Sequence, residues 1–145
     1  MDEHAYRAIH RDANPVRCVF EKTVLCARFR CSAAQKMLLA EREAVACIDS
    51  GTRDLCRQLL ELFTDKSRFA LRRTDDDAPL THGQAMRIRI GGLTALKNLS
   101  NEPLEVGDDI RCIVTQMQRQ AGDFAALPFE VIVREIVHIQ WRGKK

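Results

Sequence analysis

The sequence predicts a mainly α-helical protein that folds as a single compact domain of about six helices. Three observations support this fold class. The chain has 145 residues, 46% of them hydrophobic and 30% charged, which suits one core and is too apolar for a disordered chain. Apolar residues recur every three or four positions along most of the chain, as they do on a helix face. Capping residues and glycines stand at the ends of these periodic segments.

The first half of the chain is predicted to form an antiparallel three-helix unit over residues 15–73. A first helix over 15–29 starts with an Asn-Pro pair, which is typical of a helix N-terminus. A second helix, 33–48, follows the segment SAAQ, in which Ser32 and Gln35 have the spacing of a capping box. The Ser-Gly pair after this segment ends the second helix.

A third helix over 52–73 completes the unit, with leucines along one face. Residues 74–83, TDDDAPLTHG, form a charged connector that is rich in turn residues. The C-terminal part, 84–145, is again predicted to be helical. Within it, residues 86–90 alternate apolar and basic side chains, which is the period of a strand. We therefore predict one short edge strand there, and the Gly-Gly pair that follows indicates a turn.

Three further helices are predicted after this glycine pair. Residues 93–99 form a short one. Asp108 or Asp109 caps the next, which Gly122 ends. The last helix starts at Pro128 and is apolar on more than one side, so we expect it to be wedged into the core.

Composition and charge restrict the partners of the protein. No apolar segment is long enough to span a bilayer, and the first residues do not resemble a secretory signal, so we expect a cytoplasmic protein without a membrane partner.

The formal net charge is +3, and residues 1–73 carry 14 Lys and Arg against 10 Asp and Glu. Arginine supplies 17 of the 23 basic residues, and its planar guanidinium binds carboxylates and phosphates well. We expect an anionic partner, a protein rather than a nucleic acid.

Five of the six cysteines lie between residues 17 and 56. Cytoplasmic thiols stay reduced, so these cysteines bind a metal, take part in thiol redox chemistry or pack as small apolar side chains. No C-x-x-C motif is present, and the closest pair is Cys26 and Cys31, spaced C-x₄-C. This pair is the best candidate for redox chemistry, because neighbouring arginines would lower a thiol pKa there.

The predicted helices divide these cysteines into two groups. Cys31 and Cys47 flank the second helix and would lie about 24 Å apart at a rise of about 1.5 Å per residue. One metal ion could not bind both. Because the helices run antiparallel, Cys18, Cys47 and Cys56 meet at one end of the unit and face its interior. Cys26 and Cys31 meet at the other end.

The cysteine pattern favours a metal centre. Four thiolates hold iron–sulfur clusters, and thiolate-rich sets also select zinc, which usually requires closer Cys pairs than this chain has. We therefore predict an iron–sulfur cluster, with zinc as the alternative. The predicted ligands are Cys18, Cys47 and Cys56, with Cys31 as the contested fourth, and with Cys26 if the site is built around the C-x₄-C pair. Other candidates for the fourth position are Cys112, His4 and His10.

Arginines beside these cysteines provide the predicted partner-binding residues, Arg17, Arg53 and Arg57. They would offset the negative charge of thiolates and dock an acidic protein. The predicted function is a small metal-binding protein that acts in electron transfer or assists a redox or cluster-handling complex. The alternative is a metal-free helical module that binds an acidic protein or nucleic acid through its arginines. The common motifs of nucleotide-binding enzymes, serine hydrolases and zinc proteases are absent from the sequence, so nothing in it argues for catalysis.

Overall fold

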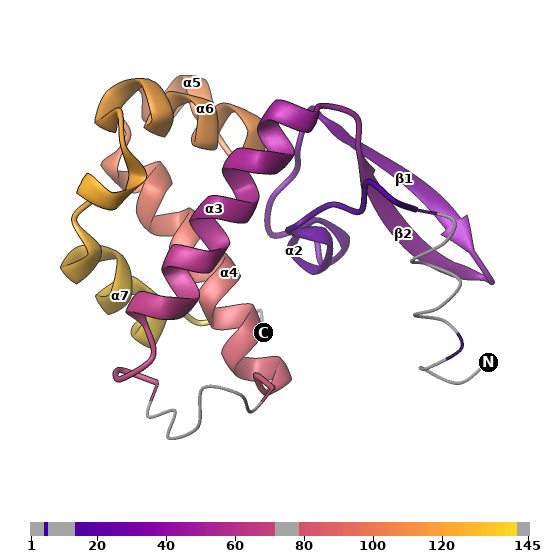
Figure 1. Ribbon diagram of the computed structural model, residues 1–145, viewed down its shortest axis with the longest axis horizontal. Coiled ribbons are helices and arrows are strands. Elements are labelled where there is room, and N and C mark those ends of the chain that lie inside the picture. Colours follow the sequence, from indigo (N-terminus) through magenta and orange to yellow (C-terminus); the bar gives the residue numbers. More distant parts are fainter. Residues whose placement is uncertain (1–4, 6–13, 72–78, 142–145) are drawn as a thin grey trace.

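The computed structural model describes residues 5, 14–71 and 79–141. In these residues a helical body carries a two-stranded antiparallel hairpin that projects from one side (Figure 1). Labelled as in Figure 1, the elements are α2 (Glu21–Leu25), β1 (Ala34–Leu39), β2 (Arg42–Cys47), α3 (Ser50–Lys66), α4 (His82–Leu99), α5 (Pro103–Val106), α6 (Ile110–Ala121), the 3₁₀ helix η1 (Phe124–Ala126) and α7 (Phe129–His138).

The mainly helical prediction is confirmed, but the N-terminal three-helix unit is wrong. Residues predicted as a second helix over 33–48 form the hairpin β1–β2 instead. Ala40 and Glu41 make its two-residue turn, with φ values of 51° and 71°. Both residues thus have the positive φ that a tight hairpin turn requires, without the Asn-Gly sequence that usually announces it. Pairing between the two strands overrides the helix propensity of their Ala, Gln, Lys, Leu and Glu residues.

The predicted first helix over 15–29 is also largely wrong, because only the five residues of α2 are helical. Residues before α2 pair with β2 instead: Arg17 forms an antiparallel bridge to Ala46. Ala27, two residues after α2, has a φ of 63°, which breaks the helix. The third predicted helix, over 52–73, corresponds to α3, which starts at Ser50 and ends earlier, at Lys66. Asp49 provides its N-cap by accepting hydrogen bonds from the first backbone N–H groups.

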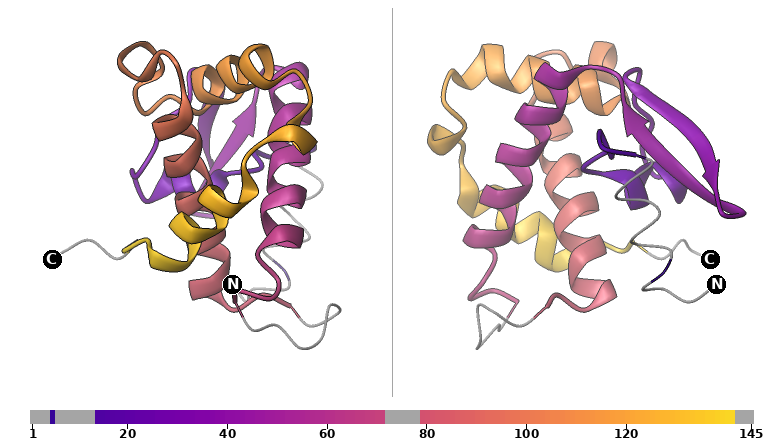
Figure 2. Two further views of the ribbon diagram at one scale, coloured as in Figure 1. Left: turned by 90° about the vertical axis from the view of Figure 1, so that its left-hand side faces the viewer. Right: turned by 45° about the vertical axis from the view of Figure 1, so that its right-hand side comes forward.

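Helix α4 runs through the middle of the body and contacts α2, α3, α6 and α7 (Figure 2). It includes residues 86–90, so the predicted edge strand is wrong. Met86, Ile88 and Ile90 are all buried, because neighbouring helices cover more than one face of α4. Their alternation with arginines therefore does not indicate a strand. The short helix predicted over 93–99 is the second half of α4.

Gly91 and Gly92 allow α4 to pack closely against two neighbours. A Cβ atom at Gly91 would lie 2.6 Å from the Cα of Ile136 in α7. A Cβ at Gly92 would meet the ring of Phe63 in α3. The two glycines thus lie where α4 packs against α3 and α7. They do not form the turn that the sequence indicates.

The remaining helices follow their predicted capping signals. Asp109 caps α6, Gly122 follows its last turn, and α7 begins directly after Pro128. A capping box of Thr81 and Gln84 starts α4, so the predicted 74–83 connector ends at residue 81. Half of that connector, residues 74–78, lies outside the described residues. Among the described residues, no helix has the length and apolar character to cross a membrane.

Candidate metal centre

Cys18 and Cys47 are brought together by the segment that pairs with β2. The backbone N–H of Cys18 donates to the carbonyl of Val45 at 2.9 Å, and that of Cys47 donates to the carbonyl of Val16 at 2.8 Å. Both cysteines therefore lie at the end of β2 that joins α3. Cys47 is buried, and its thiol donates to the backbone carbonyl of Asp49 at 3.2 Å. The predicted proximity of Cys18 and Cys47 is supported, although strand pairing replaces the predicted helix hairpin.

Cys31 and Cys56 approach the same region from two other elements. Cys31 lies three residues before β1, whose first residue, Ala34, pairs with Cys47. The predicted separation of about 24 Å between Cys31 and Cys47 is therefore wrong, because it assumed a continuous helix between them. Cys56 lies on the buried face of α3, together with Leu59 and Phe63. Helix α3, which carries it, contacts β2.

Cys18, Cys31, Cys47 and Cys56 are close enough that the charge of each thiolate would affect the other three. Burial first, and then the charges of Cys31 and Cys47, raises the pKa of Cys18 to about 12. Burial and the charges of Cys31, Cys18 and Cys47 raise the pKa of Cys56 above its usual range. Burial also raises the pKa of Cys31, to which Cys47 contributes. We call Cys18, Cys31, Cys47 and Cys56 the four-thiol group.

Backbone N–H groups point at two members of the four-thiol group. The N–H of Phe20 opposes the rise in the pKa of Cys18, and the N–H groups of Ala33 and Arg111 oppose that of Cys31. Arg111 belongs to the first turn of α6, where the helix dipole also favours a thiolate. The protein thus has donors placed to stabilise negative sulfur atoms once their protons have left.

The thiols of the described residues are not drawn together around one ion. All six cysteines are free. Within residues 5, 14–71 and 79–141, no three Cys, His, Asp or Glu side chains form a group that could hold a metal ion.

Of the other candidate ligands, two lie within the described residues and two lie outside them. Cys26 is exposed, and its thiol donates to the carbonyl of Thr23 at 3.4 Å. Cys112 interacts with Asp109, which raises its pKa after the effect of burial. His4 and His10 are outside the described residues. The structure thus brings Cys31 to Cys18, Cys47 and Cys56, and leaves Cys26 at the surface.

The predicted partner-binding arginines have local partners. Arg17 pairs with the buried carboxylate of Glu21 at 2.8 Å, and Glu21 also accepts a hydrogen bond from the N–H of Val45 at 2.8 Å. The Nε of Arg53 donates to the backbone carbonyl of Arg17, and Arg57 pairs with Asp54 at 2.7 Å. Sequence reasoning did not identify Glu21, because nothing in the sequence marks it as the carboxylate that ties residues 17–21 to β2.

Two aspartates hold the elements around the four-thiol group in place. Asp109 accepts hydrogen bonds from the N–H of Ser32 at 2.9 Å and from that of Arg111 at 3.1 Å. It thereby fixes the chain beside Cys31 to the start of α6. Asp49 caps α3 and pairs with Arg111 at 2.7 Å, so the N-termini of α3 and α6 are joined.

We expect Asp109→Asn to weaken the fold by about 1–2 kcal/mol at neutral pH, because charged hydrogen bonds at a helix N-cap are lost. Burial alone would raise the pKa of Asp109, but the hydrogen bonds of Ser32 and Cys112 and the charge of Arg30 lower it below 3.8. Its contribution is therefore complete above that value and is lost as the pH falls below it. Urea unfolding between pH 6 and pH 2 should show the variant and the wild type converging in acid. A difference that stays constant over this range would contradict the prediction.

We expect the thiols of the metal-free protein to react in an order set by burial. Cys26 is exposed and should be alkylated first by iodoacetamide at pH 8, whereas the raised pKa values of Cys18 and Cys56 keep these two thiols protonated and slow. Mass spectrometry of digested samples taken over time gives the order. Modification of Cys56 as fast as that of Cys26 would show that the four-thiol group is open to solvent.

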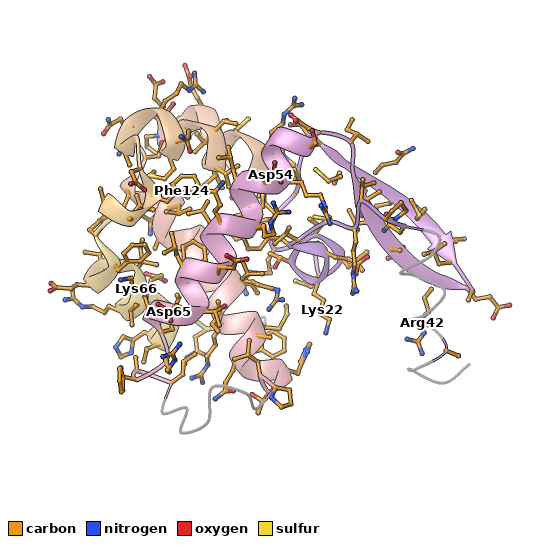
Figure 3. All side chains as sticks on the ribbon, in the orientation of Figure 1. Lys22, Arg42, Asp54, Asp65, Lys66 and Phe124 are labelled. Atoms are coloured by element: carbon orange, nitrogen blue, oxygen red, sulfur yellow. The ribbon has the colours of Figure 1, made fainter. Side chains whose placement is uncertain are left out.

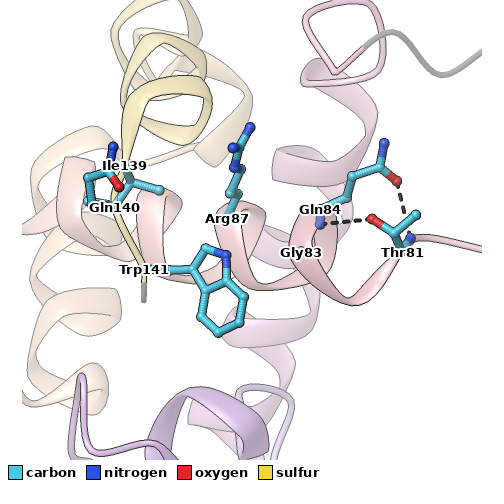
Figure 4. A pocket seen from close by; sticks show the side chains of 7 residues that line it. All are labelled: Thr81, Gly83, Gln84, Arg87, Ile139, Gln140 and Trp141. Carbon is cyan, nitrogen blue, oxygen red and sulfur yellow. Dashed lines mark hydrogen bonds between the residues drawn. The ribbon is translucent and has the colours of Figure 1, made fainter. Parts of the chain in front are cut away.

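A separate cavity of about 480 Å³ lies where the segment after α7 passes the start of α4 (Figure 4). Thr81 and Gln84 of its lining are engaged in the capping box, and Arg87 is its charged side chain. The ring of Trp141 packs edge-on against His82 at 5.2 Å. This cavity contains none of the cysteines.

Comparison of the chain with models of protein families, with curated proteins and with solved structures finds no match.

Proposed function

We propose that the protein binds an iron–sulfur cluster through Cys18, Cys31, Cys47 and Cys56 and acts as a cytoplasmic one-electron carrier. The observation that carries this proposal is the strand pairing that sets Cys18 and the segment after Cys31 beside Cys47, next to the N-terminal part of α3 that carries Cys56. Four cysteine thiolates are the usual ligands of [2Fe–2S] and [4Fe–4S] clusters. Neither Cys26 nor Cys112 is among the causes of the raised pKa values of Cys18, Cys31 and Cys56.

The cysteine pattern in the sequence favours a cluster over zinc. Zinc sites usually contain closer Cys pairs than this chain has, and the closest pair here is spaced C-x₄-C. Thiolate-rich ligand sets with few histidines are typical of iron–sulfur centres.

Backbone N–H groups of Phe20, Ala33 and Arg111 favour negative charge on Cys18 and Cys31, whereas burial opposes it. Cys47 and Cys56 are both buried. Hydrogen bonds to cluster sulfurs and burial are two of the factors that set a cluster's reduction potential. Since each thiol must lose a proton to become a ligand, cluster binding should release protons and strengthen as the pH rises.

Anaerobic purification from iron-supplied cells, followed by a visible absorption spectrum and assays of iron, sulfide and zinc, tests this proposal. We expect broad visible absorption that bleaches on reduction, with iron and acid-labile sulfide in equal amounts. Stoichiometric zinc without colour would replace the electron carrier with a structural metal site. A folded protein without iron, sulfide or zinc would leave the cysteines as packing residues, and the arginine-based interaction module would then be the better proposal.

A further inference from the structure

A cavity of about 370 Å³ lies between the end of α2 and the start of β1. Its apolar lining includes Val24, Phe29 and Ala34, and Cys31 also lines it. Val24 and Phe29 are only 5% and 6% exposed, so the cavity reaches down to the hydrophobic core. Sites for small molecules usually have volumes of about 300–1,000 Å³ and a largely apolar lining. The cavity is therefore large enough for a small organic molecule.

Backbone hydrogen bonds fix the wall of this cavity that contains residues 28–31. The N–H of Arg30 donates to the carbonyl of Asp108 at 2.9 Å, and the N–H of Ile110 donates to the carbonyl of Arg30 at 2.8 Å. The N–H of Ser32, directly after this wall, donates to the carboxylate of Asp109 at 2.9 Å. The wall is thus tied to the start of α6, and a ligand would not have to order it on binding.

The lining of the cavity carries an excess of positive charge. Arg28, Arg30 and Lys36 contribute three basic side chains, against one acidic side chain, that of Asp108. Asp108 is paired with Lys97 at 2.7 Å, so its charge is already offset. A concave site lined by charges of one sign attracts ligands of the opposite sign. The cavity therefore favours anions.

The three basic side chains keep most of their charge available. Arg28 donates through Nη1 to the backbone carbonyls of residues 140 and 141, at 3.1 and 2.7 Å. These neutral partners hold the guanidinium in place without compensating its charge. The side chain of Arg30 is 71% exposed, and its ion pair with the N-cap aspartate of α6 is long, at 3.4 Å. Lys36 is exposed and makes no ion pair within the parts of the chain that the structure describes.

We propose that this cavity, which we call the Cys31 cavity, binds a small organic molecule that has an apolar body and an anionic group such as a carboxylate or a phosphate. The apolar lining would contact the body of the molecule. The planar guanidinium groups of Arg28 and Arg30 fit the oxygens of a carboxylate or phosphate. A neutral apolar molecule would leave these cations without a partner, and an inorganic anion would leave the apolar lining in contact with water.

This binding site goes beyond the proposed function and does not depend on a bound cluster. Cys31 is the only residue of its lining that is also proposed as a cluster ligand. Binding to the Cys31 cavity can therefore be measured on the metal-free protein. A chain that is found to bind neither iron nor sulfide would still give every result described below, so failure of one proposal can be told apart from failure of the other.

A second cavity that combines apolar and basic residues is the main competitor for such a ligand. It has a volume of about 430 Å³ and lies between the end of α3 and the start of α7. Phe129 and Val133 are its apolar residues, and Lys66 and Arg134 are its basic residues, opposed by one glutamate. The ammonium of Lys66 lies 5.4 Å from the centroid of the Phe129 ring, so its charge already has an aromatic partner. Figure 3 shows Lys66 on the side of the body opposite the hairpin.

Fluorescence titration of the full-length, metal-free protein with anilinonaphthalenesulfonate tests the inference. This probe has an apolar aromatic body and one sulfonate, and phenylnaphthylamine is the same body without the sulfonate. The proteins compared are the wild type, Lys36→Glu and Lys66→Glu. Both substitutions change the net charge equally, and each affects a different cavity. Circular dichroism establishes that every sample is folded.

We expect the wild type to bind the sulfonate about tenfold more tightly than the neutral probe, because hydrogen bonds to charged groups form only with the sulfonate. Lys36→Glu should weaken binding of the sulfonate about fivefold and leave that of the neutral probe within about twofold. High salt should reduce the difference between the two probes. Lys66→Glu should change the affinity for either probe by no more than about twofold.

Alkylation of Cys31 by iodoacetamide locates the bound probe without any substitution. Burial raises the pKa of Cys31, so the reaction is run at pH 9, where more of the thiol is ionised. At a probe concentration of about ten times the dissociation constant, about one site in eleven is free, so Cys31 should react about tenfold more slowly. Cys26 and Cys112 do not line the cavity, and their rates should stay within about twofold. Mass spectrometry of digested samples gives the three rates.

Three results would each overturn the inference. One is equal affinity of the wild type for the charged and the neutral probe, which would mean that the basic side chains take no part in binding. Another is a greater loss of sulfonate binding in Lys66→Glu than in Lys36→Glu, which would place the probe in the cavity between α3 and α7. The third is an unchanged rate of Cys31 alkylation at a saturating concentration of the sulfonate probe.

Discussion

Cys56→Ser is expected to remove the bound iron and sulfide from the protein, whereas Cys26→Ser is expected to retain both. Cys56 is 6% exposed on the inner face of α3, where the charges of three other thiolates would reach it. A serine hydroxyl does not ionise near neutral pH and is a poor ligand for soft iron–sulfur centres. The loss of a first ligand should therefore exceed the roughly 10–100-fold loss known for residues that only support a ligand. Iron and sulfide per chain after anaerobic purification give the result.

Cys26→Ser is a matched control, because it makes the same replacement of one sulfur by oxygen in the same half of the chain. It is exposed and lies outside the four-thiol group. Cys112→Ser adds a second control in α6, beside Asp109. Far-ultraviolet circular dichroism of each variant separates loss of the cluster from loss of the fold. Retention of iron by Cys56→Ser together with its loss from Cys26→Ser would show that the ligands surround the C-x₄-C pair instead.

The helices with strong end signals could be predicted from the sequence. Asp109 and Gly122 delimit α6, and Pro128 stands directly before α7, as their capping preferences predict. Such signals are local, so they do not depend on which surface the helix later buries. The middle of α4 lacks them, and its burial on several faces makes its apolar residues look alternating. The secondary structure of that segment depends on tertiary packing, which cannot be derived from a single sequence.

The hairpin could not be predicted, because its turn has no sequence signal. Ala40 and Glu41 adopt positive φ although neither is Gly, Asn or Asp. The strands that flank the turn consist largely of helix formers, and strand pairing with residues 16–18 stabilises them only in the folded chain. The positive φ angles of Ala40 and Glu41 could therefore not be predicted from the sequence.

The candidate site was predicted in part, and the reason is geometric. Cys18 and Cys47 come together, but through the pairing of residues 16–18 with β2 instead of through the predicted helix hairpin. The position of Cys31 depends on which hairpin forms, because a strand pair sets its neighbours directly beside Cys47. A helix would instead separate the two cysteines by its full length. The closeness of Cys31 to Cys47 therefore could not be predicted from the sequence.

Gly91→Ala is expected to destabilise the protein by about 2 kcal/mol or more, although alanine is the better helix former. Alanine in a helix gains about 1 kcal/mol over glycine. At Gly91, however, the new methyl group would lie 2.6 Å from the Cα of Ile136 and 3.0 Å from its backbone nitrogen. Overpacking of a core costs about 1–3 kcal/mol and occasionally more. Because the obstacle is backbone, no side-chain rotation relieves it, and α4 and α7 must move apart.

Gly83→Ala is the control for this prediction, since it makes the same change in the same helix. A Cβ there meets nothing within 4 Å, so the substitution should be neutral or stabilising by up to about 1 kcal/mol. Urea unfolding of the metal-free proteins, followed by circular dichroism, gives both free energies of unfolding. Gly91 lies where α4 meets α7, and neither helix contributes a cysteine, so folded Gly91→Ala protein should still bind iron. Equal stability of the Gly91→Ala and Gly83→Ala variants would mean that α4 and α7 do not pack as closely as their glycine contact requires.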